Sequence, residues 1–360
     1  MSNEPRTPLA GKVVLYVGEM LDGSTSLQRC EAIERQGCRV VRLATRASQI
    51  RAPLAARIMA AAYRNGIELP TPDPLDVNDR LAQAIVAERP DLLWLDKALA
   101  VIPQTLRNAR AKLPALVIAG YSPDDMGQRH NRSTAFGRHL PLYDIFFTTK
   151  SYGVAELRAL GCRNPVFVAN AYDPALHRPL DLGQDERERF GGPITFIGSY
   201  EPERASAIAA IVDAGLPVRV WGAGWPDISQ FPSGMTVEGR ALYGEDYVRT
   251  LCASDINLCF LRKLNRDQQT TRSVEIPACG AFMLAERTSE HEALFTEGQE
   301  AEYFAGIDEL IAKCFFYLKH PDKRASIAAA GLARCRRDGY SNDQRMKSML
   351  EKSFAMEARA

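Results

Sequence analysis

Short apolar runs alternate with helical patterns along almost the whole chain. In the first half, runs of strand length occupy 12–18, 38–45, 91–96, 115–122, 144–149 and 165–170. Amphipathic stretches fall between them, such as the one marked by Leu81, Ala84 and Ile85. Strands separated by helices in this way predict parallel βαβ units, with helices on both faces of a sheet.

The alternation pauses once and then resumes. Residues 172–192, YDPALHRPLDLGQDERERFGG, show no periodicity. Further strands are predicted at 194–199, 217–224, 256–261 and 282–286, and helices at 202–215, 307–319, 322–337 and 342–358. We therefore predict an α/β chain of two Rossmann-like, doubly wound parallel-sheet domains: 1–171, a linker over 172–192, 193–340, and a final helix over 341–360 that can cross back to the first domain. Ligands of such sheets bind at the carboxyl ends of the strands, so a cleft between the domains is the expected site.

Composition narrows the class of protein. The chain has 360 residues, of which 46% are hydrophobic and 25% charged, as in ordinary globular proteins. Its longest apolar runs are too short to span a membrane, and MSNEPRTPLAGK at the start has no apolar core of a secretory signal. Eight cysteines without a CxxC pair and five histidines without HxxxH spacing predict buried free thiols and no zinc site. We expect a cytoplasmic protein.

Several familiar catalytic motifs are missing. The first strand is followed by Gly18-Glu-Met-Leu-Asp-Gly23 and not by GxGxxG, so a dinucleotide cofactor is poorly supported. Neither GxxxxGK[ST] nor GxSxG occurs. No two aspartates are separated by a single residue, so the DxD metal site of many sugar-nucleotide enzymes is not expected.

The second half carries an ordered series of motifs. FIGSYEPERA (196–205) and VWGAGW (220–225) each end a strand in a glycine-containing loop, and DQQTTRSVEIPACG (267–280) places an acidic residue and seven further residues before Glu-x-x-Ala-x-Gly. VANAYDPALHRP (168–179) and YLKHPDKR (317–324) flank them. In this order the segments resemble the CgeB-like, group-1 glycosyltransferases, which have the GT-B fold and are related to the retaining family 4 enzymes.

The resemblance implies a nucleotide-diphosphate sugar as co-substrate, with no other cofactor and no metal. Glu275 would accept hydrogen bonds from both ribose hydroxyls, and Asp267 would accept from the donor sugar. Backbone amides around Thr270 to Ser273, which include that of Thr271, would point at the pyrophosphate, and Arg272 would help to stabilise the departing diphosphate. The other donor-side residues implied are Gly198, Arg204, Gly222, Gly224 and Gly280.

Two basic residues would carry the catalytic charge. Arg262 and Lys263 follow the strand INLCFL and would stabilise the departing diphosphate. Solvated charges at a strand end explain them as well, and Glu275 has an alternative as a favourable dipole partner at a helix start. The signature also departs from the family pattern, because Asp267 replaces the usual glutamate. A proline inside the motif predicts that its helix begins near Glu275.

The first half offers an acceptor loop. YSPDDMGQRHNRS follows a strand, so Asp124, Asp125 and His130 should overhang its carboxyl end. The resemblance implies that this loop faces the acceptor, with Asp125 as a base or positioning group and Asp124 and His130 beside the acceptor. A solvated turn or a helix cap explains the same residues. Retaining members of the fold need no dedicated base, since the leaving phosphate can take the acceptor proton.

Charge is unevenly distributed. The first 170 residues carry 22 basic and 16 acidic side chains, and the remaining residues carry 23 and 28. Residues 42–64 contain five arginines and no acid. This stretch either contacts an anionic membrane surface weakly or packs on the sheet with its arginines in water.

These observations predict a GT-B glycosyltransferase of the hexosyltransferase type, retaining and metal-independent. Its partners would be a nucleotide sugar and a glycan, protein or lipid-linked acceptor, and not a nucleic acid. One alternative is a sugar-nucleotide epimerase of the same fold, which needs no acceptor. Another is a non-enzymatic coat or surface-assembly protein that has kept the fold.

Overall fold

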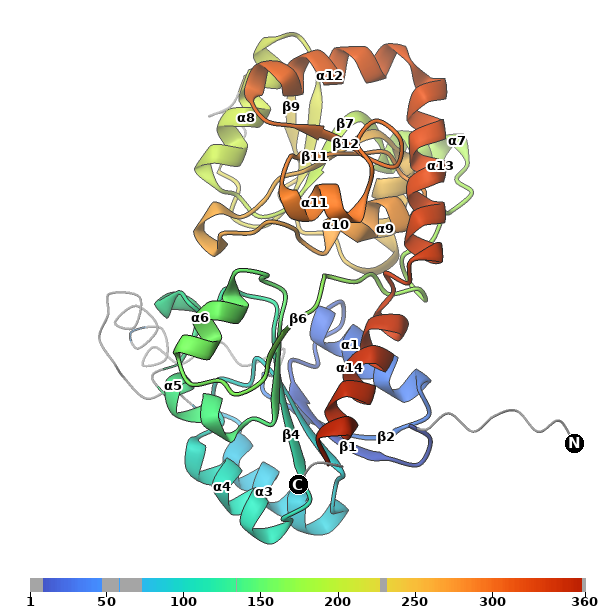
Figure 1. Cartoon of the computed structure of the whole chain (residues 1–360). Helices are drawn as coiled ribbons and strands as arrows, with labels where there is room; N and C mark the ends of the chain where they lie inside the picture. The colour runs from blue at the N-terminus through green and yellow to red at the C-terminus, as the bar shows by residue number, and fades with distance from the viewer. Residues whose placement is uncertain (1–8, 47–57, 59–72, 134, 227–231, 358–360) are drawn as a thin grey trace, which may run out of the picture. The chain divides into compact units, whose positions relative to one another are not determined.

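The chain divides into two compact units. The computed structural model describes residues 9–46, 58, 73–133, 135–226 and 232–357 (Figure 1). The first unit comprises Met1–Ala169 with Asn342–Ala360, and the second comprises Asn170–Ser341. Each is built around one parallel sheet, as the alternating pattern predicts.

The first unit holds a six-stranded parallel sheet of order β2-β1-β3-β4-β5-β6. Its strands are β1 Val13–Gly18, β2 Arg39–Ala44, β3 Leu92–Asp96, β4 Val117–Ser122, β5 Ile145–Thr148 and β6 Pro165–Phe167. Its helices are α1 Thr25–Arg35, α3 Val77–Glu88, α4 Pro103–Lys112, α5 Phe136–His139, α6 Gly153–Ala159 and α14 Asn342–Glu357, with short 3-10 helices η1 Arg129–Asn131 and η2 Leu140–Leu142.

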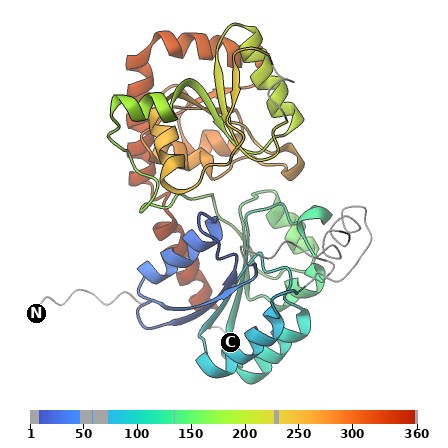
Figure 2. The same cartoon turned by 180° about the vertical axis from the view of Figure 1, so that it is seen from behind.

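Period-two alternation along β1 sends neighbouring side chains to opposite faces of this sheet. Leu15 and Val17 belong to the core under α3 and α4, whereas Val14 and Tyr16 belong to the core under α1 and α14. Figure 2 shows α3 and α4 from the side opposite to Figure 1. Both faces are covered, so β1 is almost entirely apolar, as is usual for a central strand of a parallel sheet.

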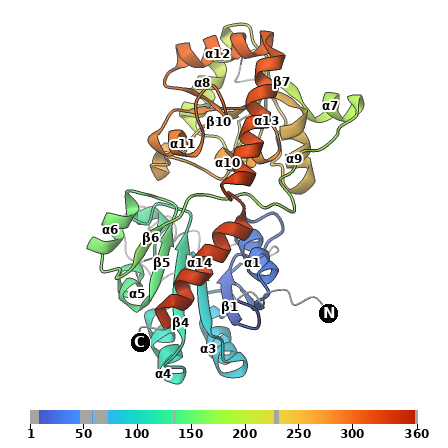
Figure 3. The same ribbon diagram turned by 45° about the vertical axis from the view of Figure 1, so that its right-hand side comes forward.

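The last helix belongs to the first unit although it follows the second in sequence. Helix α14 packs against α1 and β4 (Figure 3). Met346, Met349 and Leu350 are buried in the same core as Trp94 of β3. The C-terminal helix is therefore part of the first unit's hydrophobic core.

The second unit repeats the architecture with sheet order β12-β11-β10-β7-β8-β9, again fully parallel. Its strands are β7 Gly192–Ile197, β8 Val218–Trp221, β9 Met235–Val237, β10 Ser254–Cys259, β11 Met283–Glu286 and β12 Glu302–Phe304. Its helices are α7 Gln184–Phe190, α8 Pro202–Asp213, α9 Gly244–Ala253, α10 Arg272–Ala278, α11 Ser289–Leu294, α12 Ile307–Lys319 and α13 Pro321–Arg337, with the 3-10 helix η4 Lys263–Asn265.

Two expectations about local structure differ from what is found. Residues 172–192, predicted as a linker, lie in the second unit and include α7. The motif helix begins at Arg272 and not near Glu275, with Pro277 inside it. The N–H groups of Val274 and Glu275 both bond to the Thr271 carbonyl, so the first turn forms ahead of the proline. Pro277 removes only one later hydrogen bond.

Three further features bear on the predictions. All eight cysteines lie within the described residues and are free, and all but Cys252 are buried. No helix among the described residues is long and apolar enough to cross a membrane. Most of the arginine-rich stretch 42–64 lies outside the described residues, so its predicted membrane contact stays a prediction.

Candidate functional site

In the second unit, the loops after β7 and β8 are joined by hydrogen bonds. Gly198 donates its N–H to the Trp221 carbonyl at 2.8 Å, and the Trp225 indole donates to the Gly198 carbonyl at 2.9 Å. Gly222 has φ +156°, and a Cβ there would lie 1.8 Å from the Gly198 oxygen. The predicted glycines at these two loops therefore allow backbone contact at the carboxyl end of the sheet. Gly224 and Gly280 both have positive φ, as turns require.

Two arginines lie beside the ring of Phe196 at the same end of β7. The guanidinium carbon of Arg204 is 5.7 Å from the ring centroid, and that of Arg272 is 6.0 Å from it. The Nε atoms of both are buried and have no hydrogen-bond partner among the described residues. Burial lowers the pKa of Arg204, and the nearby charge of Arg272 lowers it further. Two neighbouring guanidinium groups whose buried Nε donors have no partner in the described part of the chain form a site for an anion.

The carboxylate of Glu201 compensates only part of this charge. Its Oε1 lies 3.5 Å from Nη1 of Arg204 and 3.1 Å from Nε of Arg262. Among the described residues no carboxylate forms an ion pair with Arg272. The carboxyl end of β7 therefore carries more guanidinium groups than paired carboxylates.

Glu275 is buried on α10, where the hydroxyl of Tyr247 orients its carboxylate and His177 lies nearby. Tyr247 of α9 donates to Oε2 at 2.7 Å, and burial, followed by the charge of Glu275, raises the pKa of Tyr247. Nδ1 of His177 accepts from the Asp173 N–H at 3.0 Å, so in neutral His177 the ring hydrogen is on Nε2, 3.8 Å from Oε1 of Glu275. The side chain of Glu275 is 8% exposed.

A buried relay of hydrogen bonds, from Thr270 through Ser273 and His291 to the Glu286 carbonyl, stabilises the turn that precedes α10. The Thr270 N–H donates to Oγ of Ser273 at 2.9 Å, and that oxygen lies 2.7 Å from Nε2 of His291. Nδ1 of His291 must donate to the Glu286 carbonyl, so Nε2 accepts from Ser273. Burial lowers the pKa of His291, which keeps the ring neutral and the relay intact.

This relay changes the expectation for the amides around Thr271. The N–H of Thr270 is taken by Ser273, and the N–H of Arg272 lies 3.3 Å from Oγ1 of Thr270. The amides on either side of Thr271 are thus satisfied by side chains and do not present donors to a ligand. At this turn the side chain of Arg272 is the stronger candidate for anion binding.

The other predicted donor-side residues are engaged within the unit. Asp267 accepts from the Asn265 side chain at 2.7 Å in the loop between β10 and α10. Lys263 forms an ion pair with Glu286, whose other oxygen accepts from the Leu261 N–H at 2.7 Å. Lys263 is 61% exposed and Arg262 is 50% exposed, so both can reach solvent molecules.

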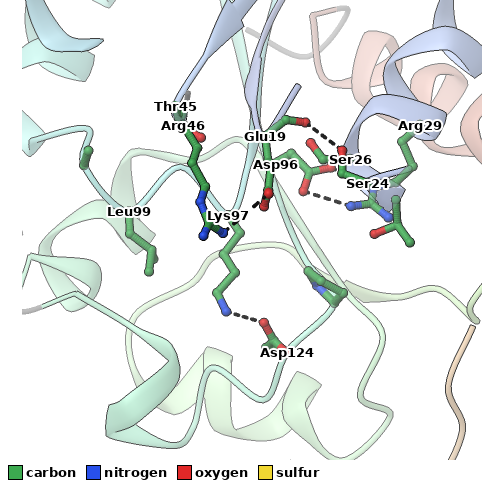
Figure 4. A pocket seen from close by; sticks show the side chains of 13 residues that line it. Glu19, Ser24, Ser26, Arg29, Thr45, Arg46, Asp96, Lys97, Leu99 and Asp124 are labelled. Carbon is green, nitrogen blue, oxygen red and sulfur yellow. Dashed lines mark hydrogen bonds and ion pairs between the residues drawn. The ribbon is translucent and has the colours of Figure 1, made fainter. Parts of the chain in front are cut away.

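The first unit contains a pocket of its own at the carboxyl ends of four adjacent strands. It has a volume of about 530 Å³ (Figure 4). The residues that line it follow β1, β2, β3 and β4 or begin α1: Glu19, Ser24, Thr25, Ser26, Arg29, Thr45, Arg46, Asp96, Lys97, Leu99, Ala100, Pro123 and Asp124. This is where doubly wound sheets bind ligands.

A buried ion pair forms part of the pocket wall. Asp96 accepts from Arg29 at both oxygens, at 2.7 and 3.0 Å, and from the Tyr16 hydroxyl at 2.5 Å. The Arg29 guanidinium also lies 4.3 Å from the centroid of the Tyr121 ring. Burial alone would lower the pKa of Arg29, but the Asp96 carboxylate raises it overall, so the guanidinium of Arg29 stays charged.

Lys97 lies beside this pair in a strained conformation. Its φ of 45° is left-handed, which costs roughly 1 kcal/mol or more for a residue other than glycine. The Lys97 N–H bonds to the Tyr121 carbonyl at 2.8 Å, which fixes the backbone there. Its ammonium group forms an ion pair with Asp124 within the pocket (Figure 4).

The three predicted acceptor-side residues have different surroundings. Asp124 lines the pocket, whereas Asp125 is fully buried and accepts from the Gly127 N–H at 3.0 Å, the contact of a tight turn. His130 lies in η1 and does not line the pocket. We therefore do not retain Asp125 as a base, because its carboxylate cannot meet a substrate from that position.

Comparison with known proteins agrees with the fold. The model of the glycosyl transferase-like family matches residues 204–351. No curated protein matches the chain in sequence. Among the described residues, no cluster of His, Cys, Asp or Glu has the makings of a metal site.

Solved structures match over nearly the full length. A glycosyltransferase from Rickettsia africae is 11% identical with a TM-score of 0.63, covering 96% of this chain and 98% of its own. Anabaena HepE in complex with UDP-glucose is 14% identical with a TM-score of 0.61, covering 94% and 99%. Sucrose-phosphate synthase from Thermosynechococcus elongatus is 11% identical with a TM-score of 0.63, covering 97% and 100%. The chain therefore has the GT-B fold, as predicted, and its second unit is similar to the glycosyl transferase-like family.

Several residues at these sites were not predicted. Tyr247 lies on α9, a helix for which no prediction was made, and His177 lies in the predicted linker. Asp96 and Lys97 did leave a signal, since an acid and a base follow the apolar run LLWL at a strand end. The partners Tyr16 and Arg29 left none, because only folding brings them to Asp96.

Substitution of Gly222 tests the contact between the β7 and β8 loops. In Gly222→Ala the new Cβ meets the Gly198 oxygen, so the backbone must shift, and we expect a loss of roughly 2–4 kcal/mol in stability. Calorimetric unfolding measures this loss. Gly192→Ala, at the start of β7, is the matched control, since its Cβ would have only ordinary contacts of 3.6 Å or more. Equal melting temperatures for the two variants would contradict the contact.

Proposed function

We propose that this protein is a glycosyltransferase that moves a sugar from a nucleotide-diphosphate sugar to a hydroxyl-bearing acceptor. The observation that carries the proposal is a pair of guanidinium groups beside Phe196, one on the buried Arg204 and one on the half-buried Arg272, whose buried Nε donors have no partner among the described residues. A diphosphate supplies the two negative charges and the acceptor oxygens that this pair lacks. The family match over 204–351, which includes both arginines, supports the same reading.

Glu275 is the proposed ribose ligand. A carboxylate can accept from two adjacent hydroxyls at once, and Tyr247 fixes its orientation through the bond to Oε2. Glu275 and Arg272 lie three residues apart on helix α10, so their side chains are neighbours on its surface. One short helix can therefore contact both the ribose and the diphosphate. Asp267, separated from Glu275 by seven intervening residues, is the proposed contact for the transferred sugar.

The proposed reaction breaks the bond between the anomeric carbon and the diphosphate oxygen. The diphosphate leaves with the electron pair, and Arg204 and Arg272 stabilise its charge, with Arg262 and Lys263 at the exposed rim. The acceptor oxygen bonds to the anomeric carbon, and its proton passes to the released phosphate. No protein base is then needed, in keeping with the buried position of Asp125.

Three finer properties are proposed with it, on the resemblance of the donor signature to the CgeB-like group: a hexose as the transferred group, retention of anomeric configuration, and no requirement for a divalent cation. UDP-glucose is the first donor to test, since HepE was solved with it.

We expect turnover to persist in EDTA and an NMR spectrum of the product to show the donor's anomeric configuration. Loss of turnover in EDTA, restored by Mg²⁺, would contradict the third property.

Arg272→Met tests the anion site. Removing a charge-assisted donor worth about 1.5–3 kcal/mol should weaken UDP binding tenfold to a hundredfold or more in titration calorimetry. The unliganded variant should melt at the same temperature as the wild type or higher, because the variant lacks the like charge that Arg272 places beside Arg204. Arg337→Met on α13 is the control, since that side chain is 59% exposed. Unchanged UDP affinity in Arg272→Met would refute the site.

Glu275→Gln tests the ribose contact and keeps the shape of the side chain. The wild type should bind UDP about tenfold more tightly than 2′-deoxy-UDP, since one charge-assisted hydrogen bond is lost with the deoxy compound. In the variant this preference should shrink to less than about threefold, because the amide cannot accept as strongly from either hydroxyl. Calorimetric titration of both nucleotides into both proteins gives the four affinities. An undiminished preference in Glu275→Gln would assign the ribose to another residue.

A further inference from the structure

The pocket of the first unit differs from the anion site of the second in its charge balance. Each cation that lines it forms an ion pair with a carboxylate that also lines it. Arg29 lies 2.7 Å from Asp96, and Arg46 lies 3.5 Å from Glu19. Lys97 is paired with Asp124. The lining therefore has no net charge among the described residues.

This balance argues against an anionic ligand. A phosphate or carboxylate in the pocket would gain attraction only from cations that already hold a carboxylate, and it would be repelled by that carboxylate. A hydroxyl group has no such conflict, because its oxygen accepts from Lys97 or an arginine while its hydrogen is donated to Asp124 or Glu19. Paired donors and acceptors side by side suit a ligand with several hydroxyl groups.

The remaining lining fits the same kind of ligand. Ser24, Thr25 and Thr45 bring hydroxyl groups to the wall, and Leu99 and Pro123 add a small apolar surface against which the C–H face of a sugar ring can pack. The volume of about 530 Å³ is within the range of small-molecule sites. Lys97 and Asp124 are 28% and 25% exposed, so their ion pair is open to a ligand in the pocket (Figure 4).

We propose that this pocket binds a neutral, hydroxyl-rich carbohydrate as the acceptor, and that the Lys97–Asp124 ion pair contacts adjacent hydroxyls of it. The inference rests on the proposed function, which requires an acceptor, and adds the chemical class of that acceptor. It favours a free or glycan-borne neutral sugar over a sugar phosphate or an anionic lipid surface. The ion pair with Asp124 places the Lys97 ammonium group at the pocket wall.

Saturation-transfer NMR on the full chain tests the proposal with matched probes. The probes are glucose, mannose and N-acetylglucosamine, each beside its own 6-phosphate. We expect transfer to at least one neutral sugar, and at least fivefold weaker binding of its 6-phosphate. Asp124→Asn and Lys97→Met should each reduce the neutral signal at least fivefold, whereas Arg39→Met, an exposed change on β2, should leave it unchanged. Glu275→Gln should also leave it unchanged, which separates this pocket from the donor site.

Several outcomes would overturn the inference. They are tighter binding of a 6-phosphate, no binding of any neutral sugar, or neutral binding that is insensitive to both Asp124→Asn and Lys97→Met. The protein is also mixed with phosphatidylglycerol vesicles, and binding to these vesicles without binding to any of the sugars would overturn the inference as well. A parallel UDP titration separates this failure from failure of the proposed function. If UDP binds and no neutral sugar does, the donor assignment stands and the acceptor class is wrong; if UDP does not bind, the proposed function fails whatever the sugars do.

Discussion

Parallel strands bring all their carboxyl ends to one edge of a sheet, and both candidate sites of this chain depend on that constraint. In the first unit, strand order β2-β1-β3-β4 places Glu19, Arg46, Asp96 and Asp124 around one pocket although 105 positions of sequence separate the first from the last. In the second unit, the order β10-β7-β8 does the same for the loops that carry Arg262, Gly198 and Gly222. A one-strand change in either order would disperse the groups.

The two edges use charge in opposite ways. At the first, the cations are paired with carboxylates, and the buried Arg29–Asp96 pair is satisfied by a bidentate contact and by Tyr16. At the second, the Nε donors of Arg204 and Arg272 are buried and unused among the described residues, and Glu201 forms ion pairs with both Arg204 and Arg262. Uncompensated buried charge lowers the stability of a free protein, and it is retained where a ligand supplies the missing partner. The contrast is the physical basis for assigning a dianion to one unit and a neutral ligand to the other.

Much of the fold follows from sequence because the strands are covered on both faces. Runs such as LLWL (92–95) and ITFI (194–197) are mostly apolar, and their spacing predicts the βαβ units. The prediction fails where the signal is short or polar. Strands β9 and β12 have three residues each, and α7, QDERERF, reads as a charge run. Helix α10 starts earlier than its proline suggests, since the Thr271 carbonyl accepts from two amides ahead of Pro277.

The residues of the candidate sites also divide into those that the sequence can predict and those that it cannot. Asp124 could be singled out because it follows the end of β4, and parallel topology dictates where strand ends lie. Arg204 and Arg272 could be singled out only through the resemblance of the segments that contain them. Their partners could not, since Tyr16, Arg29, His177 and Tyr247 reach them only through packing between elements distant in sequence. Asp125 shows the limit of position alone. It lies one residue beyond Asp124, yet it is fully buried and accepts from the Gly127 N–H, whereas Asp124 lines the pocket and can meet a ligand there.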